Sequence, residues 1–572
     1  MKKIIQLISL LLAAMFLLTA CGTPSGPADD TTADTTVDDT TTGGNGGEET
    51  PEEKTRWGHA LNIDGDAVYN LLNTRKFWVD GEWSVDDLEA DAIEYFNDHY
   101  QDCGLSDILY SIEMTAPYAS DDPDLYDKID KYYTKEENGV EVDYTEKNGN
   151  CYASWLVYEN SLVDPYQVWF EQCRLNGINP WLSFRMNDVH YAHYETGHSP
   201  FGYLARENGW LIGGARQSYW NMNSSTSAGD TELWFANALD YSVPQVREQF
   251  LKRIDDRLST YDAYGIELDW QRQIWSFPTD DIENCKYMNE FIEDVNEIVE
   301  KYEAIWGHDI KIAIRINRDI DENMYFGFDV RYLAQQGWID VVIPSCYWGA
   351  TDSDMPIAEW VEELKDYNIQ IWAGLESCVT FNSRFNTIGT LAGFTAQYLS
   401  QGADKIYTFN LFNADKARFK ICESLETALS AQQRRYVVTE ANCTPFGVGF
   451  VQWKPLPMYL SVNNPGSVVI NHGTMNYTKD TVIYVGVMGV DAADINEELL
   501  TVTYNGVVCE YDGISKKSFM KEDTQYGIIV AYNVPKDAAQ DSLKGEIEFD
   551  PGMTLTVAYV ELMNGNSRLN VQ

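Results

Sequence analysis

From residue 57 to about residue 430, short apolar and β-branched runs alternate with longer stretches of helical periodicity. A short apolar run bounded by turn residues is typical of a buried strand, whereas apolar residues three and four apart indicate an amphipathic helix. Eight runs fit strands, at 58–63, 107–114, 179–184, 265–270, 310–316, 340–347, 370–375 and 405–411. Helical stretches lie between them at 85–100, 166–176, 243–260, 282–302, 330–336, 357–367 and 388–401.

This alternation predicts a parallel sheet, because each strand regains its direction through a crossover helix. Eight such units predict an α/β fold of the (β/α)8 TIM-barrel type over residues 56–432. The alternative is an open, doubly wound sheet. Such a sheet usually carries a glycine-rich phosphate loop, and neither G-x-G-x-x-G nor G-x-x-x-x-G-K occurs in the sequence.

The pattern changes after about residue 433, where helical periodicity ends. Strand-like runs at 481–487, 500–504, 527–534 and 553–562 are separated by turn sequences such as Asn505-Gly506. Short strands at this spacing predict an all-β sandwich over residues 433–572. Its role is either to bind glycan or to brace the barrel, and the sequence favours bracing because no cluster in it resembles a site.

The amino terminus has the pattern of a lipoprotein signal peptide. Lys2 and Lys3 precede an apolar run at 4–18, which ends in Leu-Thr-Ala before Cys21. We expect residues 1–20 to be removed and Cys21 to carry acyl chains; an ordinary signal peptide is the alternative. Residues 22–55 are rich in Thr, Asp, Glu and Gly, which predicts that 21–55 form a lipidated, disordered acidic linker. The expected location is the cell envelope, lipid-anchored and exposed at the surface.

The charge balance of the chain argues against two classes of binding partner. The chain has 41 Lys+Arg against 89 Asp+Glu, a net charge of −48, which argues against nucleic acid and against anionic lipid headgroups. Membrane contact is therefore expected through the lipid anchor only. The 17 Trp and 36 Tyr suit sugar binding, because pyranose faces stack on aromatic rings. Ten cysteines without any C-x-x-C pair indicate neither a zinc ribbon nor a redox motif, and one or two disulfides fit the compartment.

The densest chemistry lies at the end of the fourth predicted strand, where residues 264–272 read YGIELDWQR. Residues two apart in a strand share a face, so Glu267 and Asp269 both point into the barrel or its mouth. Two carboxylates there repel, which raises at least one pKa and suits general acid catalysis. The alternative is an ion pair with one of three arginines: Arg185, Arg272 or Arg315.

Residues 238–247 read ALDYSVPQVR, and a helix and the strand GIELDW of residues 265–270 follow them. Together with IAIRIN at 312–317 and DVVIP at 340–344, this order resembles the barrel glycosidases typified by glycosyl-hydrolase-like family 10. The resemblance covers about residues 57–430 and implies a glycosidase fold without fixing a substrate. Glu267 stands where that family more commonly has His or Asp.

Glu376, at the end of the seventh strand, is the second candidate carboxylate. Paired with Glu267 or Asp269, it resembles the arrangement of the large clan of retaining barrel glycosidases, with an acid/base after strand four and a nucleophile at strand seven. A second scheme resembles α-galactosidase-type barrels, with Asp269 as nucleophile and Asp352 or Asp354 as acid. The separation of the carboxyl groups distinguishes retention from inversion. A capping or salt-bridged Glu376 is the non-catalytic alternative.

Other strand ends offer polar and aromatic groups for a sugar. The predicted substrate-binding residues are Arg185, Asn187, Asp188, Trp270, Arg272, Arg315, Asn317, Tyr347, Trp348, Trp372 and Asn410. The His-, Tyr- and Trp-rich insertion at 188–231 follows the third strand, and we expect it to form a wall of the cleft. No metal site or cofactor is predicted, although Asp352 and Asp354 are of the ligand type that Ca²⁺ takes.

Two functions follow from these residues. The first is a surface-anchored glycoside hydrolase that cleaves O-glycosidic bonds of a poly- or oligosaccharide with a pair of carboxylates. The second is a non-catalytic glycan-binding lipoprotein that binds through Trp270, Trp348 or Trp372. A solute-binding transport lipoprotein fits less well, because its two-lobed sheets need neither eight strand–helix units nor a β-domain.

Overall fold

The structure is a computed structural model. It describes residues 58–63, 85–112, 134–137, 140–143, 163–187, 205, 208–213, 238–271, 274–346, 351, 355–379, 385–409, 411, 416–438, 456–475, 480–520, 526–538 and 543–566. Within these ranges no helix is both long and apolar enough to cross a membrane.

The predicted barrel is confirmed. Eight parallel strands close into a ring in the order β1-β10-β9-β8-β7-β6-β5-β2. Each barrel strand therefore pairs with the barrel strands that precede and follow it in the sequence, and β1 pairs with β10 to close the ring. They are β1 His59–Ile63, β2 Leu105–Tyr110, β5 Asn179–Arg185, β6 Gly265–Asp269, β7 Lys311–Asn317, β8 Val341–Ser345, β9 Gln370–Glu376 and β10 Lys405–Phe409. Each lies within or close to a predicted run.

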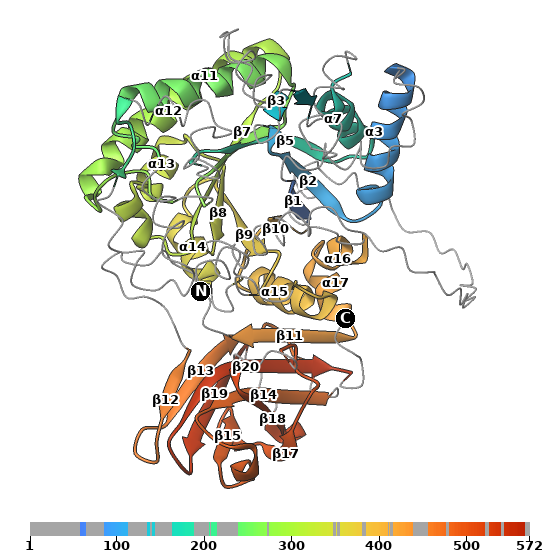
Figure 1. The fold of residues 1–572 in the computed structure, drawn as a ribbon, viewed down its shortest axis with the longest axis vertical. Coiled ribbons are helices and arrows are strands. Elements are labelled where there is room, and N and C mark those ends of the chain that lie inside the picture. Colours follow the sequence, from blue (N-terminus) through green and yellow to red (C-terminus); the bar gives the residue numbers. More distant parts are fainter. Residues whose placement is uncertain are drawn as a thin grey trace. The chain divides into compact units, whose positions relative to one another are not determined.

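Helices lie outside the ring of strands (Figure 1). They are α3 Val85–His99, α7 Pro165–Leu175, α11 Pro244–Thr260, α12 Cys285–Trp306, α13 Val330–Gln336, α14 Ile357–Leu364, α15 Ile388–Ser400, α16 Lys416–Ile421 and α17 Leu425–Ser430. Their ends follow local chemistry: Asp164 caps α7 by accepting from the backbone of Tyr166, and Gly307 ends α12 in the left-handed conformation. Two short 3₁₀ turns, η4 Ile282–Asn284 and η5 Glu322–Phe326, follow strand ends.

Alternate residues of the barrel strands face opposite sides and contribute to two separate hydrophobic cores. Outward residues such as Ile266, Leu268 and Ile314 pack under the helices, whereas a smaller cluster with Ala60, Leu109 and Trp181 fills the barrel interior. Polar residues replace apolar ones toward the carboxyl ends of the strands. Because barrel interiors normally hold branched apolar side chains, this change makes the carboxyl end of the barrel the candidate site.

The predicted β-sandwich is confirmed as two antiparallel sheets around their own core. One sheet has the order β11-β20-β14-β18-β17, with β12 beside β20, and the other the order β13-β19-β15-β16. The strands are β11 Gln433–Val438, β12 Met458–Leu460, β13 Gly466–Asn471, β14 Asp480–Met488, β15 Leu500–Tyr504, β16 Val507–Val508, β17 Glu510–Ile514, β18 Ile528–Asn533, β19 Lys544–Pro551 and β20 Leu555–Gly565. A separate hairpin joins β3 Thr134–Glu137 and β4 Val140–Asp143.

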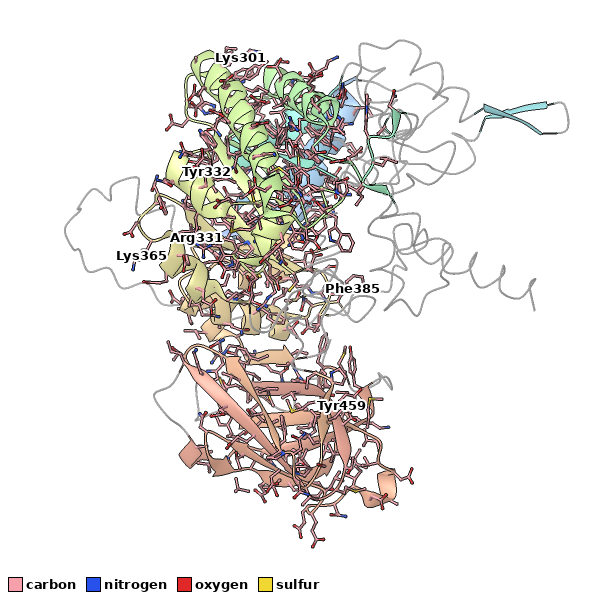
Figure 2. The ribbon with its side chains drawn as sticks, turned by 90° about the vertical axis from the view of Figure 1, so that its left-hand side faces the viewer. Lys301, Arg331, Tyr332, Lys365, Phe385 and Tyr459 are labelled. Carbon is pink, nitrogen blue, oxygen red and sulfur yellow. The ribbon has the colours of Figure 1, made fainter. Side chains whose placement is uncertain are left out.

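Large side chains also reach the surface. Tyr332 lies on the barrel helices and Tyr459 on the sandwich (Figure 2). Isolated exposed aromatics of this kind are normal on soluble proteins and identify no site by themselves.

Candidate active site

Three carboxylates converge at the carboxyl end of the barrel. Glu267 and Asp269 both lie in β6 with side chains in the interior, as their two-residue spacing predicts, and Glu376 is the last residue of β9. Glu267 and Asp269 are fully buried, and Glu376 is 4 % exposed. Arg315 of β7 and Ser345 of β8 lie in the strands between β6 and β9.

Glu267 lies in an environment without a direct cation contact in the described residues. The Asn62 amide of β1 crosses the interior and donates to Glu267 Oε2 at 2.7 Å, and it also contacts Ser183 Oγ at 3.0 Å. Burial raises the pKa of Glu267 to about 7, and the charge of Asp269 acts in the same direction. Near neutral pH, Glu267 is therefore poised between acid and carboxylate.

Arg315 joins the other two carboxylates. Its Nη1 donates to both oxygens of Asp269, at 3.1 and 3.2 Å, and its Nη2 donates to Glu376 Oε1. Burial lowers the pKa of Arg315, but Asp269, Tyr407 and Glu376 outweigh it and the net direction is upward. The guanidinium therefore stays charged and provides a counter-charge to both carboxylates.

Aromatic rings of β10 support the charged groups from the side. The Arg315 guanidinium lies over the Phe409 ring with Cζ 4.1 Å from its centre, and the Arg185 guanidinium lies 5.6 Å from the same ring. A cation over an aromatic face loses less when it leaves water. Tyr407 lies next to Glu267, whose charge raises the pKa of the buried Tyr407 hydroxyl in addition to burial.

Trp270 does not face the barrel interior, where a substrate contact would require it to lie. It follows β6 with the outward parity, is fully buried, and packs edge-on against Tyr241, Phe291 and Phe328. The prediction that Trp270 binds sugar is therefore corrected: this residue belongs to the core between the barrel and its helices.

Trp372 lies deeper in the barrel than the predicted contact with a sugar at the mouth requires. It points into the barrel but lies four residues before Glu376, about 13 Å toward the amino ends of the strands. There its ring contacts Trp181 with centres 5.3 Å apart, and Lys405 lies over it. Trp372 fills the closed end of the barrel rather than its mouth, which corrects the predicted sugar contact.

Two predicted amides bond to other parts of the chain near the strand ends, Asn187 to backbone groups and Asn317 to a side chain. Asn187 donates to the carbonyl of Trp275 at 2.9 Å and accepts from the amide of Leu239 at 2.9 Å, so it joins two chain segments beside β5. Asn317 at the end of β7 donates to Glu322 Oε2 at 2.7 Å. Glu322 is partly buried, and burial raises its pKa to about 7.

The remaining predicted positions lie outside the described residues. They are Cys21, Asp188, Arg272, Tyr347, Trp348, Asp352, Asp354 and Asn410, together with most of the insertion at 188–231. Their roles stay predictions. Within that insertion Trp210 is described, and it packs partly buried against the core.

Several site residues had no sequence signal strong enough to identify them. Asn62, Ser345 and Tyr407 each lie at an inward position of a barrel strand, but only the closed ring brings them together. A search for polar residues at inward positions near strand ends finds Asn62 and Ser345. Glu322 lies in a short turn after β7 and carries no such signal.

Neither a metal nor a redox centre is evident in the described part of the chain. No group of three or more His, Cys, Asp or Glu side chains there is arranged to hold a metal ion. The described cysteines are free thiols: Cys103, Cys173, Cys285, Cys346, Cys378, Cys422 and Cys509. The remaining two candidates for a disulfide, Cys151 and Cys443, lie outside the described residues.

Fold and site thus define a (β/α)8-barrel protein with a buried carboxylate–arginine cluster at the carboxyl ends of its strands. No family model matches the sequence, and no curated protein matches it.

Solved structures that it resembles are carbohydrate-active barrels. A family 18 N-acetylglucosaminidase from Paenibacillus barengoltzii shares 8% identity over 65% of this chain and 99% of that chain, with a TM-score of 0.32. The PgaB (BpsB) glycoside hydrolase domain from Bordetella bronchiseptica shares 12% over 64% and 99%, with a TM-score of 0.32. Chitinase ChiW from a Paenibacillus species shares 10% over 90% of this chain and 53% of its own length, with a TM-score of 0.34. At these values the likenesses carry no argument about activity.

Proposed function

We propose that this protein is a glycoside hydrolase that cleaves O-glycosidic bonds with Glu267 as the acid and Glu376 as the nucleophile or base. The proposal rests on the opposite environments of these two groups. Glu267 is bonded to a neutral amide and has a pKa of about 7, whereas Glu376 contacts the Arg315 guanidinium. Carboxyl pairs whose environments drive their protonation apart are the arrangement that glycoside hydrolysis uses.

The other members of the cluster have supporting roles in this mechanism. Asp269 holds Arg315 through both carboxylate oxygens, and its charge also helps to keep the proton on Glu267. Glu267 gives its proton to the leaving oxygen, and Glu376, bonded to the Arg315 guanidinium, attacks the sugar carbon or activates water. Removal of either reacting group is expected to lower turnover about 10²–10⁴-fold.

The test is hydrolysis of a broad glycan panel by wild type, Glu267→Gln and Glu376→Gln, measured as new reducing ends. Glu363→Gln, on the outer surface of α14, is the matched control for the chemical change. We expect product from wild type and control only. Product from both active-site variants at the wild-type rate would refute the assignment.

The second candidate function is glycan binding without turnover. One observation favours it: Arg315 engages both Asp269 and Glu376, and all three carboxylates are at most 4 % exposed. A wild-type protein that binds a glycan saturably and releases no reducing ends over hours would establish this function instead.

We also propose attachment to the cell surface through Cys21, because a basic start, an apolar run and a small-residue site precede this cysteine. Cells fed a labelled fatty acid should label wild type and leave Cys21→Ser unlabelled. A Cys443→Ser variant, which keeps the lipidation site, is the control. Equal labelling of the Cys21→Ser protein would contradict the proposal.

A further inference from the structure

Several buried amide oxygens of the described chain have no hydrogen-bond donor within it, and two of them lie at the carboxyl ends of the neighbouring strands β6 and β7. These two are Gln271 Oε1, two residues beyond Asp269, and Asn317 Oδ1 at the end of β7. Gln271 is 1 % exposed and Asn317 is fully buried. A buried acceptor without a partner costs free energy, so each such atom calls for an explanation.

The orientation of both amides is fixed by their other atoms. Gln271 Nε2 donates to the Ser345 carbonyl at 2.8 Å, and Asn317 Nδ2 donates to Glu322 Oε2 at 2.7 Å. The Ser345 carbonyl and the charged form of the Glu322 carboxylate only accept hydrogen bonds, so each NH₂ group faces its partner and each oxygen faces away from it. The backbone of Asn317 is held as well, because Asn323 bonds both its N–H and its carbonyl.

The Gln271 and Asn317 amides both lie beside Ser345 of β8. Asn317 is the register partner of Ser345 in the β7–β8 pair, and the Gln271 side chain reaches the Ser345 carbonyl from β6 across β7. Directly below, Arg315 Nε lies 3.3 Å from Ser345 Oγ while the same guanidinium binds Asp269 and Glu376. The unpartnered oxygens therefore lie on the mouth side of the carboxylate–arginine cluster.

We propose that Gln271 and Asn317 form a subsite that accepts hydrogen bonds from two hydroxyl groups of a neutral sugar ring. Glu322 is a positioning residue that orients the Asn317 amide. The inference deepens the proposed function and rests on it. An acceptor-only pair next to three carboxylates suits hydroxyl donors and disfavours uronate or sulfate groups, whose oxygens only accept.

The test measures binding instead of turnover, by calorimetry with full-length Glu376→Gln protein. The probes are neutral hexasaccharides of β-linked glucose, xylose and N-acetylglucosamine, with oligogalacturonate as the charged comparison. Gln271→Met and Asn317→Leu keep the side-chain volume and remove the acceptor. The control is Gln401→Met at the C-terminal cap of α15, since it removes an amide far from the mouth. We expect each site variant to raise Kd about five- to tenfold. Because both oxygens bind one ring, the double variant should raise Kd by less than the product of the two.

The outcomes separate the two proposals. Binding of a neutral hexasaccharide with an unchanged Kd in both site variants would overturn the subsite and leave the proposed function standing, as would a preference for oligogalacturonate. No binding of any probe would overturn both. If a variant fails to fold, monodeoxy derivatives of the bound sugar on the Glu376→Gln protein make the same test: two single hydroxyl deletions should each weaken binding about fivefold.

Discussion

Replacement of Arg315 by Met tests whether the cluster at the barrel mouth is held by one cation. Arg315 is 2 % exposed and contacts Asp269 and Glu376, so its removal takes one shared cation away from two buried carboxylates. Loss of one partner from a buried ion pair costs about 3–5 kcal/mol. Because two carboxylates lose the same cation, the expected loss lies near the upper end, about 5 kcal/mol, which is a large part of a typical folding free energy.

The loss should depend on pH and on the carboxylates themselves. A buried carboxylate without a cation can take up a proton instead, so the destabilisation by Arg315→Met should be smaller at pH 5 than at pH 8. Replacement of both acids as well, in Arg315→Met/Asp269→Asn/Glu376→Gln, should recover most of the lost stability. We would follow urea unfolding by tryptophan fluorescence, since Trp181 and Trp372 lie inside the barrel.

Arg331→Met is the matched control. Arg331 also binds two carboxylates, Asp321 at 3.0 Å and Glu363 at 2.9 Å, but on the outer surface (Figure 2). Water screens such pairs, so the expected loss is about 0–1 kcal/mol. The reasoning is refuted if Arg315→Met costs no more than Arg331→Met, or if its cost is the same at both pH values.

Three further predictions concern single groups. The fold keeps a proton on Glu267, whose pKa rises from 4.5 to about 7, so stability falls as pH rises through this window; Glu267→Gln should remove that fall, on the order of 3 kcal/mol, in unfolding titrations from pH 4 to 8. Burial lowers the pKa of His472 from 6.5 to about 4, so stability falls as pH drops through this window, and His472→Gln should flatten the acid side of the melting-temperature profile of the sandwich. Trp270→Ala should cost about 3–5 kcal/mol by leaving a cavity, whereas the Kd of a bound sugar should stay unchanged in calorimetry; a large rise in Kd without loss of stability would restore its predicted role.

Periodicity was sufficient to predict the barrel because its strands are buried on both faces and therefore form short, mostly apolar runs. It was less informative in the sandwich. Strand β19 reads KGEIEFDP with strictly alternating exposed and buried residues, yet its outward Glu and Lys side chains conceal the pattern in a hydropathy reading. Strand β13 alternates in the same way, and β12 and β16 are too short to give any periodic signal.

The alternation of strand residues that places Glu267 and Asp269 on one face also determines the direction of Trp270. Adjacent strand residues face opposite sides, so a tryptophan next to an inward Asp269 must point outward, as it does. Trp372 satisfies the parity rule but lies too deep, since parity says nothing of depth. Partners such as Asn62, which is 205 positions from Glu267, follow from ring closure and leave no local trace in the sequence.

The division of roles between Glu267 and Asp269 follows from the neighbouring strand rather than from β6 itself. In the β6–β7 register, Asp269 pairs with Arg315 whereas Glu267 pairs with Ala313. The guanidinium therefore bonds Asp269 directly, whereas Glu267 is bonded by the neutral Asn62 amide and is affected by Arg315 only through its charge. Two acids on one face of a strand would otherwise be near equivalents. The sequence Ala-Ile-Arg in β7 thus determines which carboxylate of β6 bonds the guanidinium, and the proposed role of Glu267 as the acid rests on this register.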